Sequence, residues 1–331
     1  MTVVVSLSPT EVLGPVHDRL RGELAPHQLL AVEDAGLHAL AGAGFVIGDW
    51  THQRVLGAER LDGMPRCAAI FQPTAGVQSI DVAHAARLGI PVANAPGAND
   101  RAVAEWTVMA ILALLKDVWR HHAGVRAGAW SMVEAGRTGV HELGDRTVGI
   151  VGMGRIGQAV ARRLVPFELG RLVYADVTPL SADAERTLGA QRVELDELCA
   201  VSDAVTLHVP LVAGTRALLD ARRLALMRPE AVLVNVARGA VVDERALHDA
   251  LASGRLRGAA LDVFAHEPLP PGDPLRELDR VLLSPHLAGS TNEARERMVS
   301  AALRNLDGVL RGGAPRDVVN GVKGVPRRAG G

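Results

Sequence analysis

Short apolar runs alternate with amphipathic stretches along the first 95 residues. Four of the runs have the length and composition of strands: Val3–Leu7, Phe45–Ile47, Ala68–Phe71 and Ile90–Ala93. Between them apolar positions recur at helical spacing, as in Ile80–Leu88, which stops at Gly89. Strands that alternate with helices favour right-handed crossovers and a parallel sheet. This part of the chain is therefore expected to form an α/β domain.

The same alternation starts again at residue 147 and continues to residue 284. Six strand-like runs recur there: Thr147–Val151, Leu172–Ala175, Ala204–His208, Ala231–Asn235, Gly258–Leu261 and Val281–Ser284. Helical stretches are expected between them, at residues 155–169, 195–201, 220–227 and 244–253. We therefore expect an α/β fold with two Rossmann-like, doubly wound parallel-sheet domains and a cleft between them.

A long helix is expected between the two series, from Asn99 to about His122, because its apolar residues keep a helical period. His121 and His122 at its end suggest a metal pair, but adjacent residues point in different directions on a helix. Surface histidines favoured by the helix dipole explain the pair better. Residues 123–146, around Trp130, are rich in glycine and show no clear period.

The pattern becomes helical again after residue 286 and continues to about Leu310. Ser290 and Glu293 fit a capping box at the start of this helix. The last residues, 323–331, carry three basic side chains. We interpret them as a solvated tail, with a short interaction signal as the alternative.

Composition narrows the class of protein. The net charge of −1 gives no reason to expect nucleic acid or a membrane surface as a partner. With one Tyr, four Phe and four Trp, the core has to be built from aliphatic residues, as in buried parallel sheets. Cys67 and Cys199 fit no metal spacing and are expected to be reduced thiols. No apolar run suits a membrane span or a signal peptide, so we expect a cytoplasmic protein. We also expect no bound metal.

A glycine motif, G-x-G-x-x-G, spans residues 152–157, directly after a strand-like run and at the start of a helical pattern. In that context Gly152 permits a tight turn, Gly154 lets a diphosphate approach the backbone, and Gly157 lets the helix pack close to the strand. Unpaired N–H groups and the positive end of the helix dipole would then face the phosphates.

An acidic residue follows at the spacing that dinucleotide-binding domains use. Asp176 ends the next strand-like run, 19 residues beyond Gly157, where a carboxylate can accept hydrogen bonds from a ribose. The alternative is a solvated aspartate at a strand end. Residues 177–179 contain no arginine for a 2′-phosphate, so NAD is expected in preference to NADP.

Three chemically suggestive side chains, Arg238, Glu267 and His286, follow later strands of the same series. Each has an ordinary alternative: a surface arginine before a turn, the start of a loop, and a residue at the approach to a helix. His208 also follows a strand, but we assign it no proton transfer. Because ligands in such folds bind beyond the carboxyl ends of the strands, one site explains the three better than three coincidences.

Seven blocks of sequence together are far more specific than the glycine motif alone. They are Ala75-Gly76-Val77 with Ile80-Asp81; Asn94-Ala95-Pro96-Gly97 with Asn99 and Val103-Ala104-Glu105; Gly149 to Gly157; His208-Val209-Pro210-Leu211; Asn235 to Gly239 with Val242-Asp243-Glu244; Ala260 to Phe264 with Glu267-Pro268; and Ser284 to Ser290. In this order they resemble the D-isomer-specific 2-hydroxyacid dehydrogenase family, which includes members that act on phosphoglycerate, glycerate, D-lactate and hydroxypyruvate.

The resemblance implies hydride transfer between NAD(H) and a 2-hydroxy acid/2-oxo acid pair of D stereochemistry. Arg238 would bind the substrate through its planar guanidinium. His286 would be the general acid in reduction and the base in oxidation. Glu267 would accept a hydrogen bond from the other ring nitrogen and favour the protonated ring.

The resemblance also implies ligand contacts and an assembly. NAD would contact Gly152, Gly154, Arg155, Ile156, Gly157, Asp176, His208, Val209, Pro210, Val236, Ala237, Arg238, Asp262, His286, Ala288 and Gly289. The substrate would contact Arg238 and the backbone N–H groups of Ala75, Gly76 and Val77. Residues 1–95 with 292–331 would form the substrate domain, and 96–291 the NAD-binding domain. A homodimer would form through the helix at 99–122.

Some positions depart from the family pattern and narrow the substrate. Phe71-Gln72-Pro73-Thr74 stands where relatives often carry an arginine, which leaves the side chain of the substrate open. Ala75 argues against phosphite as the substrate, and Glu267 argues against formate as the substrate. A non-enzymatic NAD-dependent binding protein is the alternative function. An epimerase-like fold would need a Tyr-x-x-x-Lys pair, which the only tyrosine, Tyr174, does not form.

Overall fold

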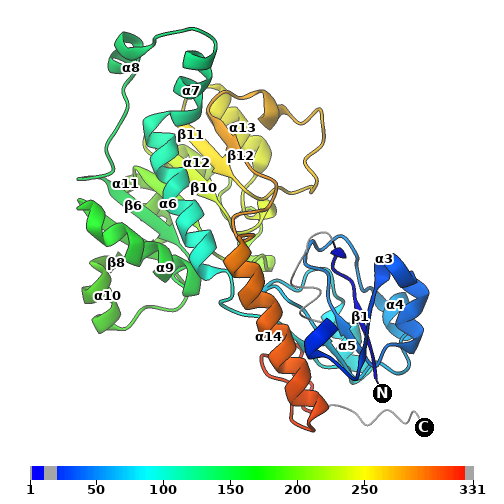
Figure 1. Ribbon diagram of the computed structural model, residues 1–331. Helices are drawn as coiled ribbons and strands as arrows, with labels where there is room; N and C mark the ends of the chain where they lie inside the picture. The colour runs from blue at the N-terminus through cyan, green and yellow to red at the C-terminus, as the bar shows by residue number, and fades with distance from the viewer. Residues whose placement is uncertain (1, 11–20, 325–331) are drawn as a thin grey trace. The chain divides into compact units, whose positions relative to one another are not determined.

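The computed structural model describes residues 2–10 and 21–324 of the chain (Figure 1). The chain divides into two compact units. Residues 1–99 and 291–331 belong to the first unit, and residues 100–290 to the second. We describe each unit by itself, starting with the second because it contains the glycine motif.

The second unit is built on a parallel sheet of seven strands. The strands are β6 (Thr147–Val151), β7 (Arg171–Ala175), β8 (Ala190–Arg192), β9 (Ala204–Leu207), β10 (Val232–Asn235), β11 (Gly258–Leu261) and β12 (Val281–Leu283). Their order, β12-β11-β10-β9-β6-β7-β8, is the Rossmann order with one additional strand. The order reverses between β6 and β9, which places a topological switch point there. The predicted parallel-sheet class is confirmed.

Helices cover both faces of this sheet (Figure 1). They are α6 (Asp100–Lys116), α9 (Arg155–Leu164), α10 (Ala182–Leu188), α11 (Leu195–Val201), α12 (Ala221–Leu226) and α13 (Glu244–Ala252), with 3-10 turns η2 (Val165–Phe167), η3 (Ala213–Thr215), η4 (Gly239–Val241) and η5 (Pro274–Glu277). Apolar residues of α11, α12 and α13 share one core with alternate strand residues, while α6, α9 and α10 share the other. The predicted helix 155–169 is shorter, because α9 ends at Leu164 and gives way to η2.

The single helix predicted from Asn99 to His122 is wrong. The chain forms α6 and a separate α7 (Val118–Arg126), because Asp117 adopts a left-handed conformation with φ 50°. Asp117 is buried, and its carboxylate lies 3.7 Å from both Arg120 and Arg257. Aspartate tolerates this conformation better than most residues, so the ion pairs hold the break in place.

The segment 123–146 is also more regular than predicted, because it contains α8 (Met132–Thr138). His121 does not belong to a metal site: its Nδ1 lies 3.1 Å from the Ser131 hydroxyl. Among residues 2–10 and 21–324, no group of three or more His, Cys, Asp or Glu residues could hold a metal ion. Cys67 and Cys199 are buried free thiols.

The first unit is built on a parallel sheet of five strands. They are β1 (Val3–Ser6), β2 (Gln28–Ala31), β3 (Phe45–Ile47), β4 (Ala69–Phe71) and β5 (Val92–Ala93). The order β2-β1-β3-β4-β5 is that of flavodoxin, the other common doubly wound arrangement, with its switch point between β1 and β3. Asn320 closes the edge at β5: its side chain accepts from Val92 N–H and donates to the Ile90 carbonyl.

Short helices and one long helix complete the first unit: α3 (Val32–Ala35), η1 (Leu37–Gly42), α4 (Ala58–Asp62), α5 (Val82–Arg87) and α14 (Asn292–Leu310). The predicted capping box of Ser290 and Glu293 is wrong, because the N-cap lies one residue later and Ala294 occupies the third helical position. Thr291 is the N-cap of α14, and its hydroxyl accepts from Ala294 N–H. The basic tail lies largely outside the described residues.

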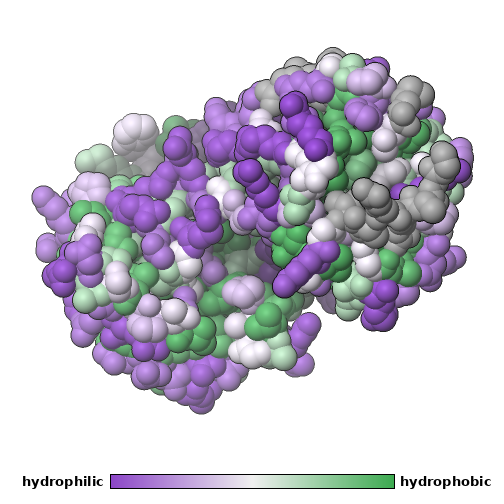
Figure 2. All heavy atoms as spheres, turned by 90° about the horizontal axis from the view of Figure 1, so that it is seen from below, coloured by the Kyte–Doolittle hydropathy of each residue, from purple (hydrophilic) through white to green (hydrophobic). Residues whose placement is uncertain are grey.

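The surface is mixed in character. On the face drawn in Figure 2, hydrophilic side chains are interspersed with apolar ones. Within the described residues, no helix has both the length and the apolar character needed to cross a bilayer.

Candidate active site

The residues predicted for the nucleotide and for the acid–base chemistry follow the carboxyl ends of strands in the second unit. β6 leads into Gly152, β7 into Asp176, β9 into His208, β10 into Arg238, β11 into Asp262 and β12 into His286. Because all seven strands are parallel, these ends lie along one edge of the sheet. That edge is where ligands bind in open α/β sheets.

The three glycines of the motif differ in what surrounds them. Gly152 has φ 93°, and an added Cβ would lie 2.8 Å from the backbone carbonyl of His208. At Gly157 an added Cβ would lie 2.1 Å from the Gly152 oxygen. Gly154, in contrast, has no atom within 4 Å of the same point. Gly152 and Gly157 are therefore required by the packing of the protein itself, while the space at Gly154 is open.

The start of α9 is open to an anion. Its N-cap is Gly154, which offers no side-chain acceptor to the first turn of the helix. The N–H groups of a first turn have no partner within the helix, and the helix dipole places partial positive charge there. The turn and the helix end together have the chemistry of a diphosphate cradle.

Asp176 is tied to the glycine turn. One carboxylate oxygen accepts from Met153 N–H at 2.6 Å, and the other from Thr178 N–H at 2.9 Å. Arg192 in β8 donates to the Asp176 carbonyl oxygen at 2.9 Å. This exposed cation was missed because only the residues just after Asp176 were considered, whereas β8 reaches the place from the neighbouring strand.

His208 is held in a neutral state. Its Nε2 lies 3.0 Å from the Thr206 hydroxyl, and its Nδ1 is buried without a partner among the described residues. Burial lowers the pKa of His208 to about 3. The ring is therefore uncharged at neutral pH, and its lack of a role in proton transfer stays a prediction from the sequence.

Glu267 and His286, two of the predicted catalytic side chains, are in direct contact. Glu267 Oε2 lies 2.7 Å from His286 Nδ1, and Oε1 accepts from Phe264 N–H at 3.0 Å. Burial acts to raise the pKa of Glu267, but hydrogen bonds from His286 and Phe264 outweigh it, so the pKa lies below its usual value. The glutamate is therefore an ionised partner of the imidazole at neutral pH.

Asp262 organises the loop that carries His286. Its carboxylate accepts from the Ser284 hydroxyl at 2.5 Å and from Leu287 and Ala288 N–H at 2.9 Å. Its backbone oxygen accepts from His286 N–H at 2.8 Å. His286 has φ 53°, a conformation that a bulky residue adopts only when its surroundings require it. Burial raises the pKa of Asp262.

Arg238 is held by the residues around it. The side chain of buried Asn235 accepts from Ala237 N–H and donates to the Arg238 carbonyl, which fixes the turn after β10. Arg238 Nη1 donates to the Ala237 oxygen at 2.6 Å. Burial lowers the pKa of Arg238, and the charge of Glu267 opposes that shift. An arginine remains charged under such a shift, so the site holds a fixed cation.

The first unit contains the predicted loop Ala75-Gly76-Val77. Within the described residues, the backbone N–H groups of these three positions donate no hydrogen bond. Consecutive unpaired N–H groups form a concave site suited to an anion. The sequence predicted these donors, but not the buried Gln72 and Thr74 that lie beside them.

The fold and this edge of the sheet define the second unit as a dinucleotide-binding domain. Residues 108–288 match the family model described as "D-isomer specific 2-hydroxyacid dehydrogenase, NAD binding domain". The chain therefore belongs to the D-isomer specific 2-hydroxyacid dehydrogenase family. The expected enzyme class, an NAD-dependent oxidoreductase of 2-hydroxy acids, and the expected cofactor, NAD, are confirmed at the level of this family.

Named relatives agree with this membership. The chain is 42% identical over 268 residues to a glyoxylate reductase of Thermofilum pendens, which covers 80% of this chain and 78% of that protein. It is 39% identical over 246 residues to a D-3-phosphoglycerate dehydrogenase of Methanocaldococcus jannaschii, covering 74% and 46%. Among solved structures, a D-lactate dehydrogenase of Aquifex aeolicus complexed with NAD and lactic acid has a TM-score of 0.83 at 28% identity, covering 94% and 96%.

Proposed function

We propose that the protein reduces a small 2-oxo acid with NADH to the D-2-hydroxy acid and catalyses the reverse reaction with NAD. The observation that carries this proposal is the 2.7 Å contact between His286 Nδ1 and Glu267 Oε2. It lies at the same sheet edge as the glycine turn. An acid–base pair beside a dinucleotide site has the chemistry that carbonyl reduction requires.

The contact also assigns the reacting atom of the imidazole. Glu267 occupies Nδ1, so Nε2 is the nitrogen left to give a proton to the carbonyl oxygen of the substrate. In the reverse direction the same atom takes the proton of the hydroxyl group. The carboxylate holds Nδ1 and so fixes the orientation of the ring. His286 is therefore the proposed general acid and base.

Arg238 and the loop at 75–77 are the proposed binding groups for the carboxylate of the substrate. A guanidinium can donate two parallel hydrogen bonds to a carboxylate. The unpaired N–H groups of Ala75, Gly76 and Val77 add donors that need no side chain. These roles make the first unit the proposed substrate domain and the second the NAD-binding domain.

The residues of the second unit suit the cofactor. The open space at Gly154 and the uncapped start of α9 are suited to a diphosphate, and Asp176 is proposed to accept from a ribose. Asp262, Val236, Ala237 and the segment 286–289 are proposed to surround the nicotinamide end. When bound, NADH supplies the hydride, and the protein supplies position and charge.

Glyoxylate is the substrate that we propose first, because the relative with 42% identity is named a glyoxylate reductase. Hydroxypyruvate and pyruvate are the next candidates, since they keep the carboxylate and carbonyl groups and differ only in the side chain. Discrimination between them depends on the first unit, where the departures from the family pattern lie.

A panel of 2-oxo acids at fixed NADH concentration tests the proposal, with loss of nicotinamide absorbance as the readout. We expect turnover with at least one of glyoxylate, hydroxypyruvate and pyruvate. In the reverse assay we expect oxidation of the D but not the L form of the two chiral products, lactate and glycerate. NADH binding without turnover on any acid would instead support a regulatory binding protein.

The same panel run with NADPH tests the cofactor preference. We expect NADH to be favoured at least tenfold in kcat/KM, because the Asp176 carboxylate would repel a 2′-phosphate. Arg192 is a cation that donates to the Asp176 carbonyl oxygen, and its replacement by glutamine should widen the preference. A preference for NADPH would contradict this assignment.

We further propose a homodimer formed through the segment α6–α8. Apolar side chains of this segment are strongly exposed: Trp130 is 80% exposed, Met132 75% and Val133 76%. Exposed apolar residues gathered in one segment mark an interaction surface. A mass measurement in solution is expected to give twice the chain mass, and W130A/M132S is expected to weaken the dimer. The cytoplasmic location stays a prediction from the sequence.

A further inference from the structure

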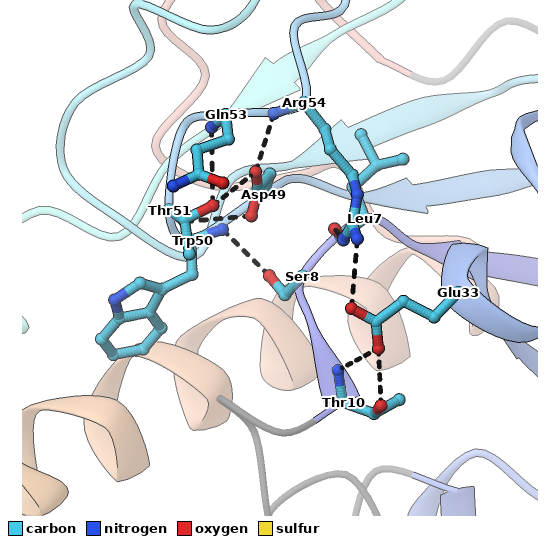
Figure 3. A network of polar contacts seen from close by, with 9 residues as sticks. All are labelled: Leu7, Ser8, Thr10, Glu33, Asp49, Trp50, Thr51, Gln53 and Arg54. Atoms are coloured by element: carbon cyan, nitrogen blue, oxygen red, sulfur yellow. Dashed lines mark hydrogen bonds and ion pairs between the residues drawn. The ribbon is translucent and has the colours of Figure 1, made fainter. Parts of the chain in front are cut away.

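The carboxyl end of the sheet in the first unit carries a polar network that the reaction described above does not use. Asp49 lies at its centre, just after β3 (Figure 3). Its carboxylate accepts from Thr51 N–H and hydroxyl and from Arg54 N–H, at 2.8 to 2.9 Å. Arg54 in turn donates to the Leu7 carbonyl and to Glu33. These contacts fix the turn at residues 49–54.

His52 lies within this turn in a left-handed conformation, with φ 58°. Its backbone N–H donates to the Asp49 carbonyl at 3.3 Å. Its ring joins two other elements: Nδ1 lies 3.0 Å from the buried Ser79 hydroxyl, and Nε2 lies 3.1 Å from the Thr74 hydroxyl. A strained conformation of a non-glycine residue persists where surrounding contacts require it. Here those contacts present the imidazole to Thr74.

Counting protons assigns the direction of each hydrogen bond at Thr74. Its hydroxyl has one proton, and the carbonyl of Gly76, at 2.8 Å, can only accept it. Gln72 Nε2 donates to the same hydroxyl at 2.8 Å. The second lone pair is then left for His52, whose Nε2 must carry the proton. The hydroxyl of Thr74 is thus fixed from two sides and directed at Gly76.

Fixing the Gly76 carbonyl also fixes the next N–H group. The carbonyl of one residue and the N–H of the next lie in one planar peptide and point in opposite directions. Thr74 therefore turns Val77 N–H away from the network. The two preceding peptides are held in the same way, because Asn94 Nδ2 donates to the Ala75 carbonyl at 2.7 Å and Ala95 N–H donates to the Thr74 carbonyl at 3.2 Å.

We propose that His52 is a positioning residue for substrate binding, which acts through Thr74 to orient the Val77 N–H toward the carboxylate. The proposal rests on the proposed function, because it assigns a substrate carboxylate to the loop at 75–77. His52 itself touches no reacting atom. Its effect is therefore on substrate affinity and not on proton or hydride transfer.

Four variants test the relay in the full-length enzyme. Thr74→Val removes the hydroxyl at constant shape, while Thr74→Ser keeps it. His52→Gln can place an amide N–H near the position of Nε2, whereas His52→Asn is too short to reach Thr74 but tolerates the left-handed conformation. His38→Asn, at an exposed histidine of the same unit, is the matched control.

Thr74→Val and His52→Asn are expected to raise KM about tenfold, the scale of one weakened hydrogen bond to a charged group. The rise should be similar for glyoxylate, pyruvate and hydroxypyruvate, because the carboxylate is common to them. The value of kcat and the KM for NADH should stay within about twofold. Thr74→Ser, His52→Gln and His38→Asn should resemble the wild type.

Other results separate the possible failures. Wild-type enzyme that turns over no 2-oxo acid would refute the proposed function itself. Turnover by the wild type with unchanged KM in Thr74→Val would refute the relay alone. A rise in KM for only one acid would show that His52 or Thr74 contacts the substrate side chain, and a parallel rise in KM for NADH would show general loosening of the fold. Either result overturns the positioning role.

Discussion

The two parallel sheets each reverse their strand order once, but the two switch points have different contents. In the second unit, between β6 and β9, the backbone of Gly152 approaches that of His208, and the helix that follows has no side-chain cap. In the first unit, between β1 and β3, Ser8 bridges the strand ends by donating to Gly48 O and accepting from Trp50 N–H. One switch point offers free backbone donors, and the other is filled by side chains.

This difference shows how far topology alone determines a binding site. A switch point provides a place where loops diverge, but the residues in those loops decide whether a ligand can enter. Glycines and an uncapped helix leave donors for phosphate. In the first unit, Ser8 instead bonds to Gly48 and Trp50, and Gln72 donates to the Asp49 carbonyl. The free donors of this unit lie farther along, at residues 75–77.

Removing the imidazole of His286, in the second unit, should have the largest effect on the reaction rate. His286→Ala is expected to lower kcat by about 10²–10⁴-fold, the usual contribution of a general acid. The Kd for NADH should change little, since the glycine turn is untouched. Single-turnover rates and NADH fluorescence titration measure the two quantities. Near-normal rates in His286→Ala would remove the proposed proton donor, whereas His52→Asn should retain kcat and so separates the two histidines.

A pair of glycine variants tests whether the open switch point is a ligand site or only a tight turn. Gly154→Ala adds a methyl group where no protein atom lies within 4 Å, so the melting temperature should be unchanged while the Kd for NADH rises at least about tenfold. Gly157→Ala forces a Cβ to within 2.1 Å of the Gly152 oxygen. It is expected to cost about 1–3 kcal/mol in the free energy of unfolding.

Thermal unfolding with and without NADH distinguishes these two outcomes. If Gly154→Ala bound NADH normally, the diphosphate would not approach the backbone at this turn. If both variants lost the same stability, the open space at Gly154 would have no significance for the ligand.

The smallest expected effect concerns the filled switch point. Hydrogen bonds from the hydroxyl and N–H of Thr10 lower the pKa of Glu33 from 4.5 to about 2. A carboxylate with a lowered pKa stabilises the fold above pH 4.5, and that stabilisation is lost as the pH falls toward 2. Glu33→Gln should therefore lower the melting temperature by roughly 1–3 °C at pH 7, and the difference should disappear near pH 2. A difference that is constant with pH would exclude the charge as its cause.

The sequence predicted the long elements and the positions of the suggestive side chains, but not their local geometry. Strands with continuous apolar runs, such as β6 and β10, are confirmed, whereas β2 and β8 were missed because they are short and partly polar. Asp117, where the long helix breaks, pairs with nearby Arg120 and also with Arg257, which lies 140 positions farther along the chain, so no local pattern could reveal the second pair.

The candidate site shows the same limit. Because the strand ends share one edge, Arg238, Glu267 and His286 were predicted to form one site. In the structure, Glu267 and His286 are in contact. An ordering role for Asp262 at this end of the pocket was one of two roles expected from the resemblance. Its hydrogen bonds were not predicted, because they depend on how Ser284 and Leu287 fold back onto the carboxylate. In the sequence, the only sign of this role is that an aspartate directly follows an apolar strand.

The close packing at Gly239 bears on how enzymes of this family can change their substrate. A Cβ at this position would lie 1.9 Å from the backbone of Phe264, so the turn that carries Arg238 rests directly on the loop that leads to Glu267. Main-chain contact, and not any replaceable side chain, sets the spacing of the two backbone segments that carry Arg238 and Glu267. Under the proposed function, new acids would be accommodated by exchanging residues of the first unit while these two segments keep their separation.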